Sequence, residues 1–253
     1  MIPVFYRLVT EYVHYFLLPL YAKVTVKGVE NLPRKGPVII VSNHLNDADP
    51  GVLATRSPRR RVYMTKVELF RVPVLKTFLK WYGAFPVRRG EADLSALRRS
   101  NETLKAGLAL VLFPEGTRSA GDARLGKAWP GAALIALRNR VPMVPAAITG
   151  TQYMALPGMF LRPFRRYDVT LTFGEPFFLP QPARVDTAAA EAGTAVIMEK
   201  IAALLPAGYR GYYGEKADDK ETLAAPPAPG TCRWRYCGPP RWAFASAYAG
   251  RSR

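Results

Sequence analysis

The sequence has few of the residues that build disulfide frameworks and histidine-based metal centres. It contains two cysteines, Cys232 and Cys237, and two histidines, His14 and His44. Because both cysteines lie near the C-terminus, residues 1–215 have no thiol for a disulfide, which is typical of proteins from a reducing compartment. Two histidines offer little from which to build a metal site, and we expect neither a metal nor another bound cofactor.

Long apolar runs and acidic residues are also scarce. No uninterrupted apolar run reaches the roughly 20 residues that span a bilayer, and we see no cleavable signal pattern at the N-terminus. The 19 Asp and Glu residues are outnumbered by 36 Lys and Arg, so the formal net charge is +17. This charge favours polyanions, anionic lipid surfaces or phosphate-bearing substrates. If a membrane is involved, we expect the protein to lie on its surface.

The C-terminal segment does not account for this charge. Residues 216–253 are basic and rich in proline and aromatic residues, with 7 basic and 3 acidic residues, or about +4. The other 29 basic and 16 acidic residues place +13 on residues 1–215. We expect 216–253 to be a disordered tail. Its C-x4-C pair, Cys232 and Cys237, could close a small loop or supply half a zinc site, although an incidental role is the simpler interpretation.

Residues 1–21 are expected to form an amphipathic helix on a membrane surface. Large apolar and aromatic side chains surround much of this segment, whereas Arg7, Glu11 and His14 recur at intervals of four and three on one narrow polar side. The alternative interpretation is a helix that covers the core of the domain.

Residues 22–215 alternate between predicted strands and helices. Apolar or alternating segments predict strands in 22–28, 38–43, 61–66, 84–89, 108–113, 141–150 and 167–177. Amphipathic segments predict helices after Asp49 and in 69–83, 92–107, 130–140 and 186–205. This alternation predicts an α/β fold with a mixed, mainly parallel sheet flanked by helices.

A histidine follows one of the predicted buried strands. The stretch VSNHLNDADP, residues 41–50, places His44 five residues before Asp49. A histidine that acts as a general base needs a partner to fix its tautomer and to stabilise the imidazolium that forms. The two side chains can meet only if the chain turns back, and a strand-to-helix junction supplies such a turn. The alternative is that Asp49 only caps a helix that runs on through Pro50, with His44 in a surface loop.

Basic residues follow three other predicted strands. The sequence PEGTR, Pro114 to Arg118, combines a glycine that permits close approach, a hydroxyl donor and an arginine that can bind phosphate through two hydrogen bonds. Lys66 ends RVYMTK, and Arg88 and Arg89 follow GAFPV. Ligands of open α/β sheets bind at strand ends, so we expect these cations near His44. The alternative is that each is a solvated surface charge.

Four stretches, NHLNDAD, GAFPVRR, FPEGTRS and VPMVPAAI, occur in this order between residues 38 and 151. In this arrangement the chain resembles the glycerolipid acyltransferase family, specifically bacterial 1-acyl-glycerol-3-phosphate acyltransferases. The residues that match the family motifs are Asn43, His44 and Asp49 in the first, Gly83 and Arg89 in the second, and Glu115, Gly116, Thr117 and Arg118 in the third, with Lys66 before ELF. The resemblance implies a glycerol-3-phosphate acyltransferase-like domain over residues 22–215, with its motif core at 38–151.

The resemblance also implies a role for each matched residue. His44 would remove the proton from the acceptor hydroxyl as that oxygen attacks a thioester carbonyl, and Asp49 would orient His44. Lys66, Arg89 and Arg118 would hold the acceptor phosphate. The remaining substrate-binding positions, which help to build the pocket, would be Glu115, Gly116 and Thr117.

The expected reaction is therefore the transfer of a fatty acyl group to the free hydroxyl of a lysophospholipid, 1-acyl-glycerol-3-phosphate, to give phosphatidic acid. The acyl donor would be acyl-coenzyme A or acyl-carrier protein, which acts as a co-substrate and not as a cofactor. The expected partners are this donor, the lysophospholipid acceptor and an anionic membrane surface. We expect a peripheral protein at the cytoplasmic face of the cell membrane, in phospholipid biosynthesis.

Three alternatives remain open at this stage. The acceptor could be another lysolipid. The chain could instead be a basic nucleic-acid-binding module, since CRWRYCGPPRWAF interleaves arginine with tryptophan and tyrosine; it has no recognised binding motif, so we do not expect nucleic acid as a partner. The third alternative, a lipid-surface scaffold without catalysis, leaves the intact pair of His44 and Asp49 unexplained.

Overall fold

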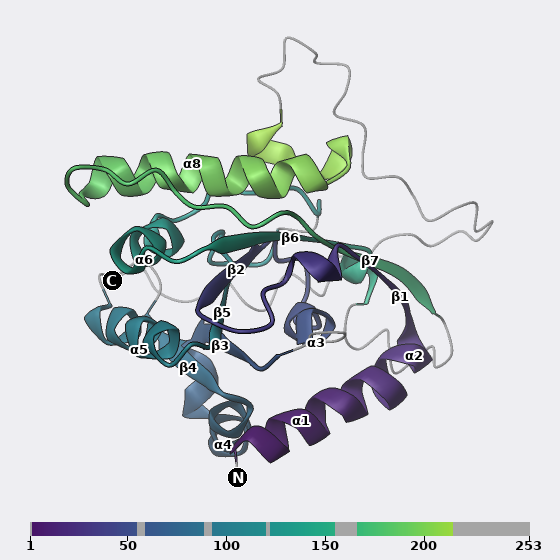
Figure 1. Cartoon of the computed structure of the whole chain (residues 1–253). Helices are drawn as coiled ribbons and strands as arrows, with labels where there is room; N and C mark the ends of the chain where they lie inside the picture. Colours follow the sequence, from purple (N-terminus) through teal and green to yellow (C-terminus); the bar gives the residue numbers. More distant parts are fainter. Residues whose placement is uncertain (1, 55–58, 89–92, 120–121, 155–165, 215–253) are drawn as a thin grey trace, which may run out of the picture.

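The computed structural model describes residues 2–54, 59–88, 93–119, 122–154 and 166–214, and within them one seven-stranded sheet forms the centre of the molecule (Figure 1). The strand order is β1-β7-β6-β2-β5-β3-β4. The strands are β1 (Ala22–Lys27), β2 (Val38–Ser42), β3 (Arg61–Lys66), β4 (Ala84–Val87), β5 (Ala109–Leu112), β6 (Met143–Thr149) and β7 (Tyr167–Phe173). The predicted tail, residues 216–253 with both cysteines, lies outside the described residues.

The sheet is mixed and mainly parallel, which confirms the predicted fold class. Within the described residues, β6 and β7 are antiparallel, and each of the other neighbouring pairs is parallel. Consequently β2 to β6 end at the same edge of the sheet at which β1 and β7 begin. We call this edge the carboxyl edge. Ligands of α/β sheets bind beyond such an edge, so a functional site is expected there.

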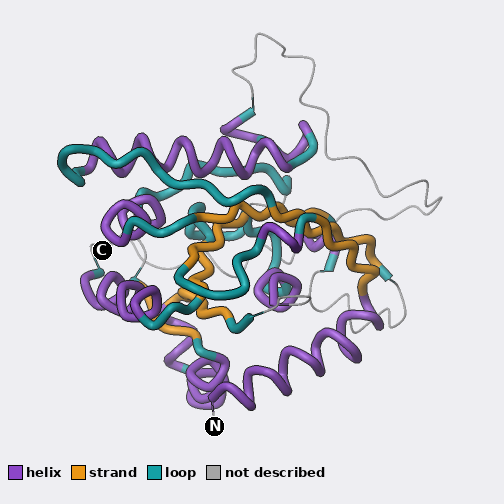
Figure 2. The backbone as a smooth tube through the Cα atoms, in the orientation of Figure 1, coloured by secondary structure: helices purple, strands orange, loops and turns teal. Residues whose placement is uncertain are grey.

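Helices cover both faces of the sheet (Figure 2). They are α1 (Ile2–Tyr12), a π-helical segment (Val13–Leu17), α2 (Leu18–Tyr21), α3 (Asp49–Ala54), α4 (Pro73–Tyr82), α5 (Leu94–Lys105), α6 (Gly131–Asn139) and α8 (Thr187–Leu204). One apolar core lies between the sheet and α5, α6 and α8, and a second lies on the opposite face beneath α2, α3 and α4. Strand β2 contributes to both cores, which explains why VIIVS is apolar at nearly every position and fully buried.

Two helix predictions need correction. The helix expected over 69–83 begins only at Pro73, after a 3₁₀ turn at Val67–Arg71, because the residue before a proline is disfavoured in the α conformation. The helix expected over 1–21 is interrupted by the π-helical segment, where the N–H of Leu18 donates to the carbonyl of Val13. Pro19 follows directly and has no N–H for a regular α-helical bond, which accounts for the change at this place.

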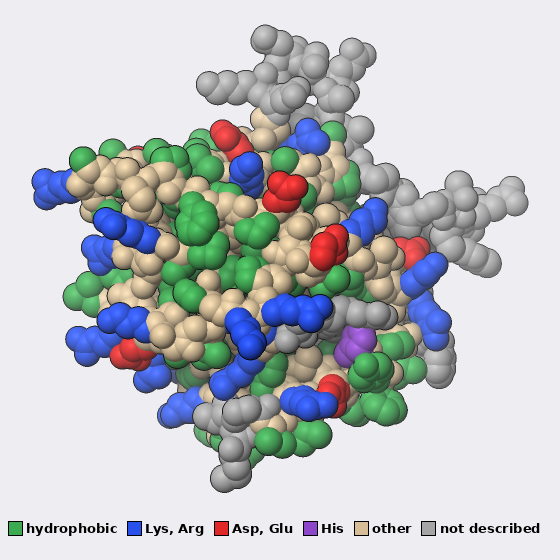
Figure 3. All heavy atoms as spheres, viewed as in Figure 1, with side chains coloured by type: hydrophobic (Ala, Val, Ile, Leu, Met, Phe, Trp, Pro, Cys, Tyr) green, Lys and Arg blue, Asp and Glu red, His purple; other side chains and the backbone are tan. Residues whose placement is uncertain are grey.

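Within the described residues, none of the helices combines the length and the apolar character that crossing a membrane requires. Basic side chains are spread widely over the face seen in Figure 3, and hydrophobic side chains gather at its lower right, near α2 and the end of the N-terminal helix. On this face the positive charge expected from the sequence is therefore spread out and not confined to one patch.

Candidate active site

The loop after β2 brings His44 and Asp49 together. His44 is 8% exposed and Asp49 is fully buried, and Nδ1 of His44 lies 2.9 Å from Oδ2 of Asp49. In the neutral tautomer that this contact favours, Nδ1–H donates to the carboxylate and leaves Nε2 free to accept a proton. The pair predicted from the sequence is thus formed at the carboxyl edge.

The carboxylate of Asp49 also holds the loop itself. Its Oδ2 accepts the backbone N–H groups of Leu45 at 2.6 Å and Asn46 at 2.8 Å. Helix α3 begins at Asp49, and the side chain turns back to the preceding loop instead of capping the helix that follows. The alternative of a helix cap beside an exposed histidine is therefore wrong. Its Oδ1 is buried and has no hydrogen-bond partner among the described residues.

The neighbouring strand β5 supplies a second support for His44. Val41 pairs with Leu112, so His44 and Glu115 leave the sheet side by side, each three residues beyond its paired position. The carboxylate of Glu115 accepts the N–H of His44 at 3.1 Å and that of Gly126 at 2.9 Å. Burial raises the pKa of Glu115, and these two N–H donors oppose the rise. Both oxygens of Glu115 therefore bind backbone groups within the protein.

Two further contacts fix the position of the histidine. The ring of Phe113 stacks on the imidazole, with centroids 4.2 Å apart and an interplanar angle of 23°. The N–H of Ser119 donates to the carbonyl of His44 at 2.8 Å. The loop that follows β5 thus holds His44 through its ring, its N–H and its carbonyl.

Asn43 joins the loop to β6 on the other side. Its amide donates to the carbonyl of Ile148 and accepts the N–H of the same residue, both at 2.8 Å. The side chain is almost completely buried. Asn43 was noted in the sequence only as part of the first motif. Its place directly before the histidine is the only sequence signal for this structural role.

Helix α3, which begins at Asp49, is held from beneath. The hydroxyl of buried Tyr63 donates to the carbonyl of Pro50 at 3.0 Å, and burial raises the pKa of this tyrosine well above its ordinary value. A side chain at Gly51 would meet Val13 of the π-helical segment. Tyr63 also stacks on Tyr82 of α4, so the helix that carries Asp49 rests on side chains from both β3 and the N-terminal helix. Sequence patterns gave no sign of this support.

Those predicted cations that the structure describes lie at the same edge but are held less firmly. Lys66 ends β3 and is exposed, and Arg88 follows β4. Arg118 is exposed and its Nη1 lies 2.6 Å from Oδ2 of Asp47, a residue that sequence reasoning did not single out. Arg89 lies outside the described residues. Lys66 does not lie next to His44, because β5 separates β3, which ends at Lys66, from β2, which leads to His44.

Gly116 and Thr117 form the turn between Glu115 and Arg118. Gly116 has φ of 67°, and a Cβ atom there would lie 3.0 Å from the indole of Trp129. Glycine is thus required both by the backbone conformation and by the close approach of the indole. Thr117 is exposed beside it.

A cavity of about 560 Å³ opens beside this turn. Most of its lining is apolar and comes from α5, α6 and the strand end at Leu112 and Phe113, with Trp129 at one side. Phe113 belongs both to this lining and to the stack on His44. The cavity falls in the range of about 300–1,000 Å³ that is typical of small-molecule sites, and it could hold an apolar chain whose end reaches the imidazole.

The described residues contain no group of three His, Cys, Asp or Glu side chains arranged to hold a metal ion. The arrangement instead offers a fixed base, an apolar cavity next to it, and exposed cations at the same edge. These three features suit the transfer of an apolar group onto a phosphate-bearing alcohol.

Comparison with known proteins agrees with this geometry. A family model described as Acyltransferase matches residues 23–149. The chain is 34% identical to the 1-acyl-sn-glycerol-3-phosphate acyltransferase of Bacillus subtilis over 63% of this chain and 76% of that protein. It is 33% identical to 1-acyl-sn-glycerol-3-phosphate acyltransferase BAT2, chloroplastic, of Brassica napus over 54% of this chain, but this spans only 43% of the plant protein's length.

A solved structure has the same fold. It is the 1-acyl-sn-glycerophosphate (LPA) acyltransferase PlsC of Thermotoga maritima, which matches with a TM-score of 0.58 and 24% sequence identity over 79% of this chain and 81% of that chain. At this identity the likeness concerns the arrangement of the sheet and helices.

Proposed function

The chain belongs to the acyltransferase family, and we propose that it transfers a fatty acyl group from a thioester to the free hydroxyl of 1-acyl-glycerol-3-phosphate, which gives phosphatidic acid. The observation that carries this proposal is the buried contact of 2.9 Å between His44 and Asp49 at the carboxyl edge. Relatives named for this reaction support the choice of acceptor.

In the proposed reaction His44 acts as the general base. Its Nε2 takes the proton of the acceptor hydroxyl while that oxygen attacks the carbonyl carbon of the thioester. The tetrahedral intermediate then collapses, the carbon–sulfur bond breaks, and the thiolate leaves with the proton that His44 returns. Asp49 keeps Nδ1 protonated and stabilises the imidazolium between the two steps. The acceptor itself attacks, so no nucleophilic serine or cysteine of the protein is required.

Three basic residues near the carboxyl edge in sequence are proposed to bind the phosphate of the acceptor. Lys66, Arg89 and Arg118 would provide the positive charge, while Gly116 and Thr117 shape the pocket. Arg118 would exchange Asp47 for the phosphate, which costs little because an exposed ion pair contributes only about 0–1 kcal/mol. Glu115 was expected among the substrate-binding residues, but its contacts with the backbone of His44 and Gly126 favour a positioning role.

The apolar cavity is proposed to hold the acyl chain of the donor. It adjoins His44 through Phe113, so a chain lying in it would bring its thioester carbonyl to the base. The donor is acyl-coenzyme A or acyl-carrier protein, both of which are anionic and suit the positive surface. Chain length would then be limited by the extent of the cavity between α5 and α6.

We also propose that the enzyme works at the cytoplasmic face of the membrane as a peripheral protein. Helices α1 and α4 join through the ring of Phe5, which contacts those of Phe78 and Trp81 at 6.0 and 5.2 Å. Together they and the adjoining segments expose large apolar side chains at Val4, Leu8, Tyr12, Tyr15, Phe16, Leu20, Leu69, Val72, Val74, Phe78 and Trp81. We call this set the interfacial surface. An exposed apolar surface of this kind on a basic protein is typical of binding to an anionic bilayer.

The two interpretations of residues 1–21 are therefore compatible. Tyr6 and Leu18 are buried against the domain, while Val4, Leu8 and Phe16 face outward. The segment covers part of the core and presents apolar groups to the bilayer. Residues 22–215 would then form the domain that carries out acyl transfer.

The proposal is tested by an assay of the full chain with a panel of lysolipids and with both acyl donors, followed by mass spectrometry of the products. We expect phosphatidic acid from 1-acyl-glycerol-3-phosphate. His44→Ala should fold normally and lose about 10²–10⁴-fold in kcat, because a general base contributes on this scale. Turnover of His44→Ala at the rate of the native chain would reject His44 as the base. If only a different lysolipid gave a product, the proposed acceptor would be wrong, but the proposed mechanism would stand.

A further inference from the structure

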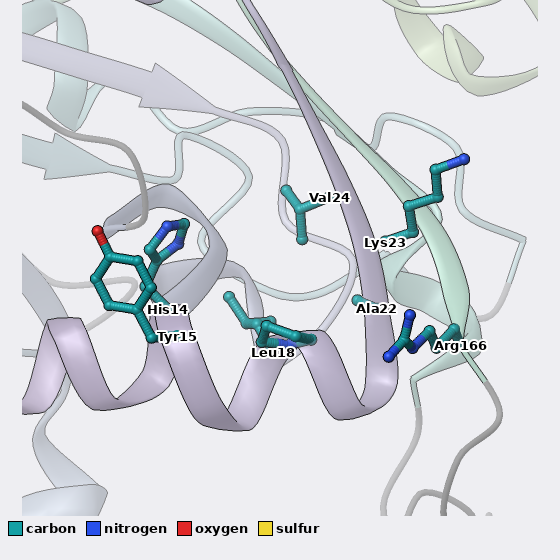
Figure 4. Close-up of a pocket in the computed structure, with 8 residues that line it drawn as sticks. His14, Tyr15, Leu18, Ala22, Lys23, Val24 and Arg166 are labelled. Atoms are coloured by element: carbon teal, nitrogen blue, oxygen red, sulfur yellow. The ribbon is translucent and has the colours of Figure 1, made fainter.

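A second cavity, of about 310 Å³, lies where α2 turns into β1 (Figure 4). Its apolar lining includes Leu18 and Val24, and its other lining residues include His14, Lys23 and Arg166. The volume lies at the lower end of the range for ligand sites. Nothing in the proposed acyl-transfer mechanism uses this cavity.

The second cavity and the active site share one edge of the sheet. Strand β1 begins at Ala22 and pairs with the start of β7 at Tyr167. Because β7 is antiparallel to β6, both starts lie at the carboxyl edge, where β2 leads to His44. Strands β7 and β6 lie between β1, beside the cavity, and β2. The cavity is therefore a separate place that faces the same direction as the catalytic histidine.

The charge around the second cavity is positive. Its lining includes Arg166 and the inner part of Lys23 but no Asp or Glu. In Figure 4 the ammonium of Lys23 points away from Leu18 and His14, so this charge lies beside the cavity and not in it. Asp168 lies opposite Lys23 in the pairing of β1 with β7, yet within the described residues neither Lys23 nor Arg166 forms an ion pair. Glu11, on the helix that leads to the cavity, is bonded to Arg7 at 2.7 Å. In Figure 4 the guanidinium of Arg166 reaches back toward Ala22, over the junction of α2 and β1.

The second cavity also adjoins the interfacial surface. Tyr15 lines the cavity and is 65% exposed, and Phe16 and Leu20 of the same helical segment are exposed as well. Aromatic side chains of this kind lie at the depth of the lipid headgroups. If these residues enter the bilayer surface, Lys23 and Arg166 come to the level of the lipid phosphates. An arginine at that level can bind a phosphate through two hydrogen bonds.

We propose that this cavity binds the phosphate of an anionic phospholipid of the bilayer, at a site distinct from the one that binds the acceptor for acyl transfer. The inference rests on the membrane docking proposed above. The bound lipid would hold the junction of α2 and β1 against the membrane. Because His44 lies at the same edge, this contact would turn the active site toward acceptors in the bilayer.

The test compares two double variants of the full chain that lose the same charge. Lys23→Gln with Arg166→Gln removes the guanidinium at the cavity and the ammonium beside it. Lys27→Gln with Arg34→Gln is the matched control, because Lys27 is exposed on the same side of β1 at the opposite edge of the sheet and Arg34 is exposed in the following loop. Binding to vesicles is measured by co-sedimentation, with phosphatidylcholine alone and with added phosphatidic acid. Thermal unfolding checks that each variant is folded.

We expect the cavity variant to lose roughly tenfold or more in binding to vesicles that contain phosphatidic acid, since two basic residues near an anionic surface contribute on this scale. The control should lose no more than about threefold, because its cations lie away from the bilayer. Equal losses in both variants, or no loss in either, would overturn the site. Turnover on a short-chain acceptor without vesicles should not change in the cavity variant. If this turnover fell as much as vesicle binding, these cations would belong to the acceptor site instead.

A second measurement on the native chain separates lipid from free ion and does not depend on folding of a variant. Amide chemical shifts are followed during titration with dihexanoyl phosphatidic acid and, separately, with inorganic phosphate. We expect the short-chain lipid to shift the amides at Ala22 to Val24, and inorganic phosphate to do so only weakly. Shifts confined to the loop of His44 would overturn the proposal. An absence of acyl transfer would reject the proposed enzyme without affecting either binding result.

Discussion

The loop of His44 and the loop of Arg118 follow neighbouring strands, yet they are held very differently. His44 is fixed through its ring, its N–H and its carbonyl, and its carboxylate partner is fully buried. Arg118 has one exposed contact, with Asp47. The difference suits the proposed chemistry, since a base must be in place before substrate arrives, whereas cations that bind a mobile phosphate gain from being free to move.

The largest effect on the fixed histidine loop is expected from a substitution that removes the charge of Asp49 and keeps its shape. In Asp49→Asn the amide oxygen can still accept the N–H groups of Leu45 and Asn46, so the loop should persist. The imidazolium formed during the reaction would lose its countercharge, and we expect kcat to fall by about 10²-fold or more. Steady-state kinetics with KM measured separately checks this, and circular dichroism shows whether the fold is retained. A variant as active as the native chain would reject the role of the carboxylate.

Glu115→Gln should weaken the fixed loop to a smaller extent. A glutamine can accept only one of the N–H groups of His44 and Gly126 through its oxygen, so its amide would face the other donor. We expect a loss of about 1–3 kcal/mol in the free energy of unfolding, the usual cost of an unsatisfied buried group. Urea denaturation measures this loss. We expect kcat to fall by about tenfold, because the histidine is less well placed. If the substitution only raised KM for the acceptor, Glu115 would instead be a substrate-binding residue.

Substitutions of Arg118 and Asp47 should change KM for the acceptor in opposite directions. Arg118→Gln should raise KM for the acceptor by about tenfold with little change in kcat, because one charged hydrogen bond to phosphate is lost. Asp47→Asn should lower KM slightly, since Arg118 no longer has to leave a competing carboxylate. Arg34→Gln, at the far edge, is the matched control for the loss of one charge. If Asp47→Asn raised KM as much as Arg118→Gln, the ion pair would be part of the pocket itself.

The smallest effect is expected from Tyr63→Phe. This change keeps the stack on Tyr82 and removes the hydrogen bond to Pro50, beneath the helix that starts at Asp49. We expect kcat to fall a few-fold with KM unchanged, together with about 1 kcal/mol of stability. A fall in kcat without a change in KM would indicate that Tyr63 helps to position the carboxylate of Asp49. A purely structural role would leave kcat, calculated per folded molecule, unchanged.

The sequence predicted most of the fold because the signals for strands and helices are local. The alternation in 22–27 and the apolar run in 38–42 identify β1 and β2 without knowledge of their neighbours. The pairing of His44 with Asp49 could also be predicted, since they are only five positions apart in the sequence. The same local patterns placed the cations at strand ends.

Contacts between distant parts of the chain could not be predicted in this way. Glu115 lies 71 residues from His44, and nothing in PEGTR shows that its carboxylate binds the backbone of the histidine loop. The bonds of Asn43 to Ile148 span 105 residues. The same holds for Tyr63, whose hydroxyl contact depends on how β3 and α3 are placed in space. Each of these roles arises from packing, which periodicity does not encode.

The π-helical segment changes the direction in which the N-terminal helix faces. Twelve positions separate Tyr6 from Leu18, and in a regular α-helix, which turns about 100° per residue, they would point about 120° apart. One extra residue in the wide turn removes about 100° of that rotation and brings them within about 20° of each other. Both side chains can therefore face the domain, as their burial requires. A single inserted residue thus lets one side of the N-terminal helix stay packed against the domain, and it leaves the opposite side continuous for the proposed contact with lipid.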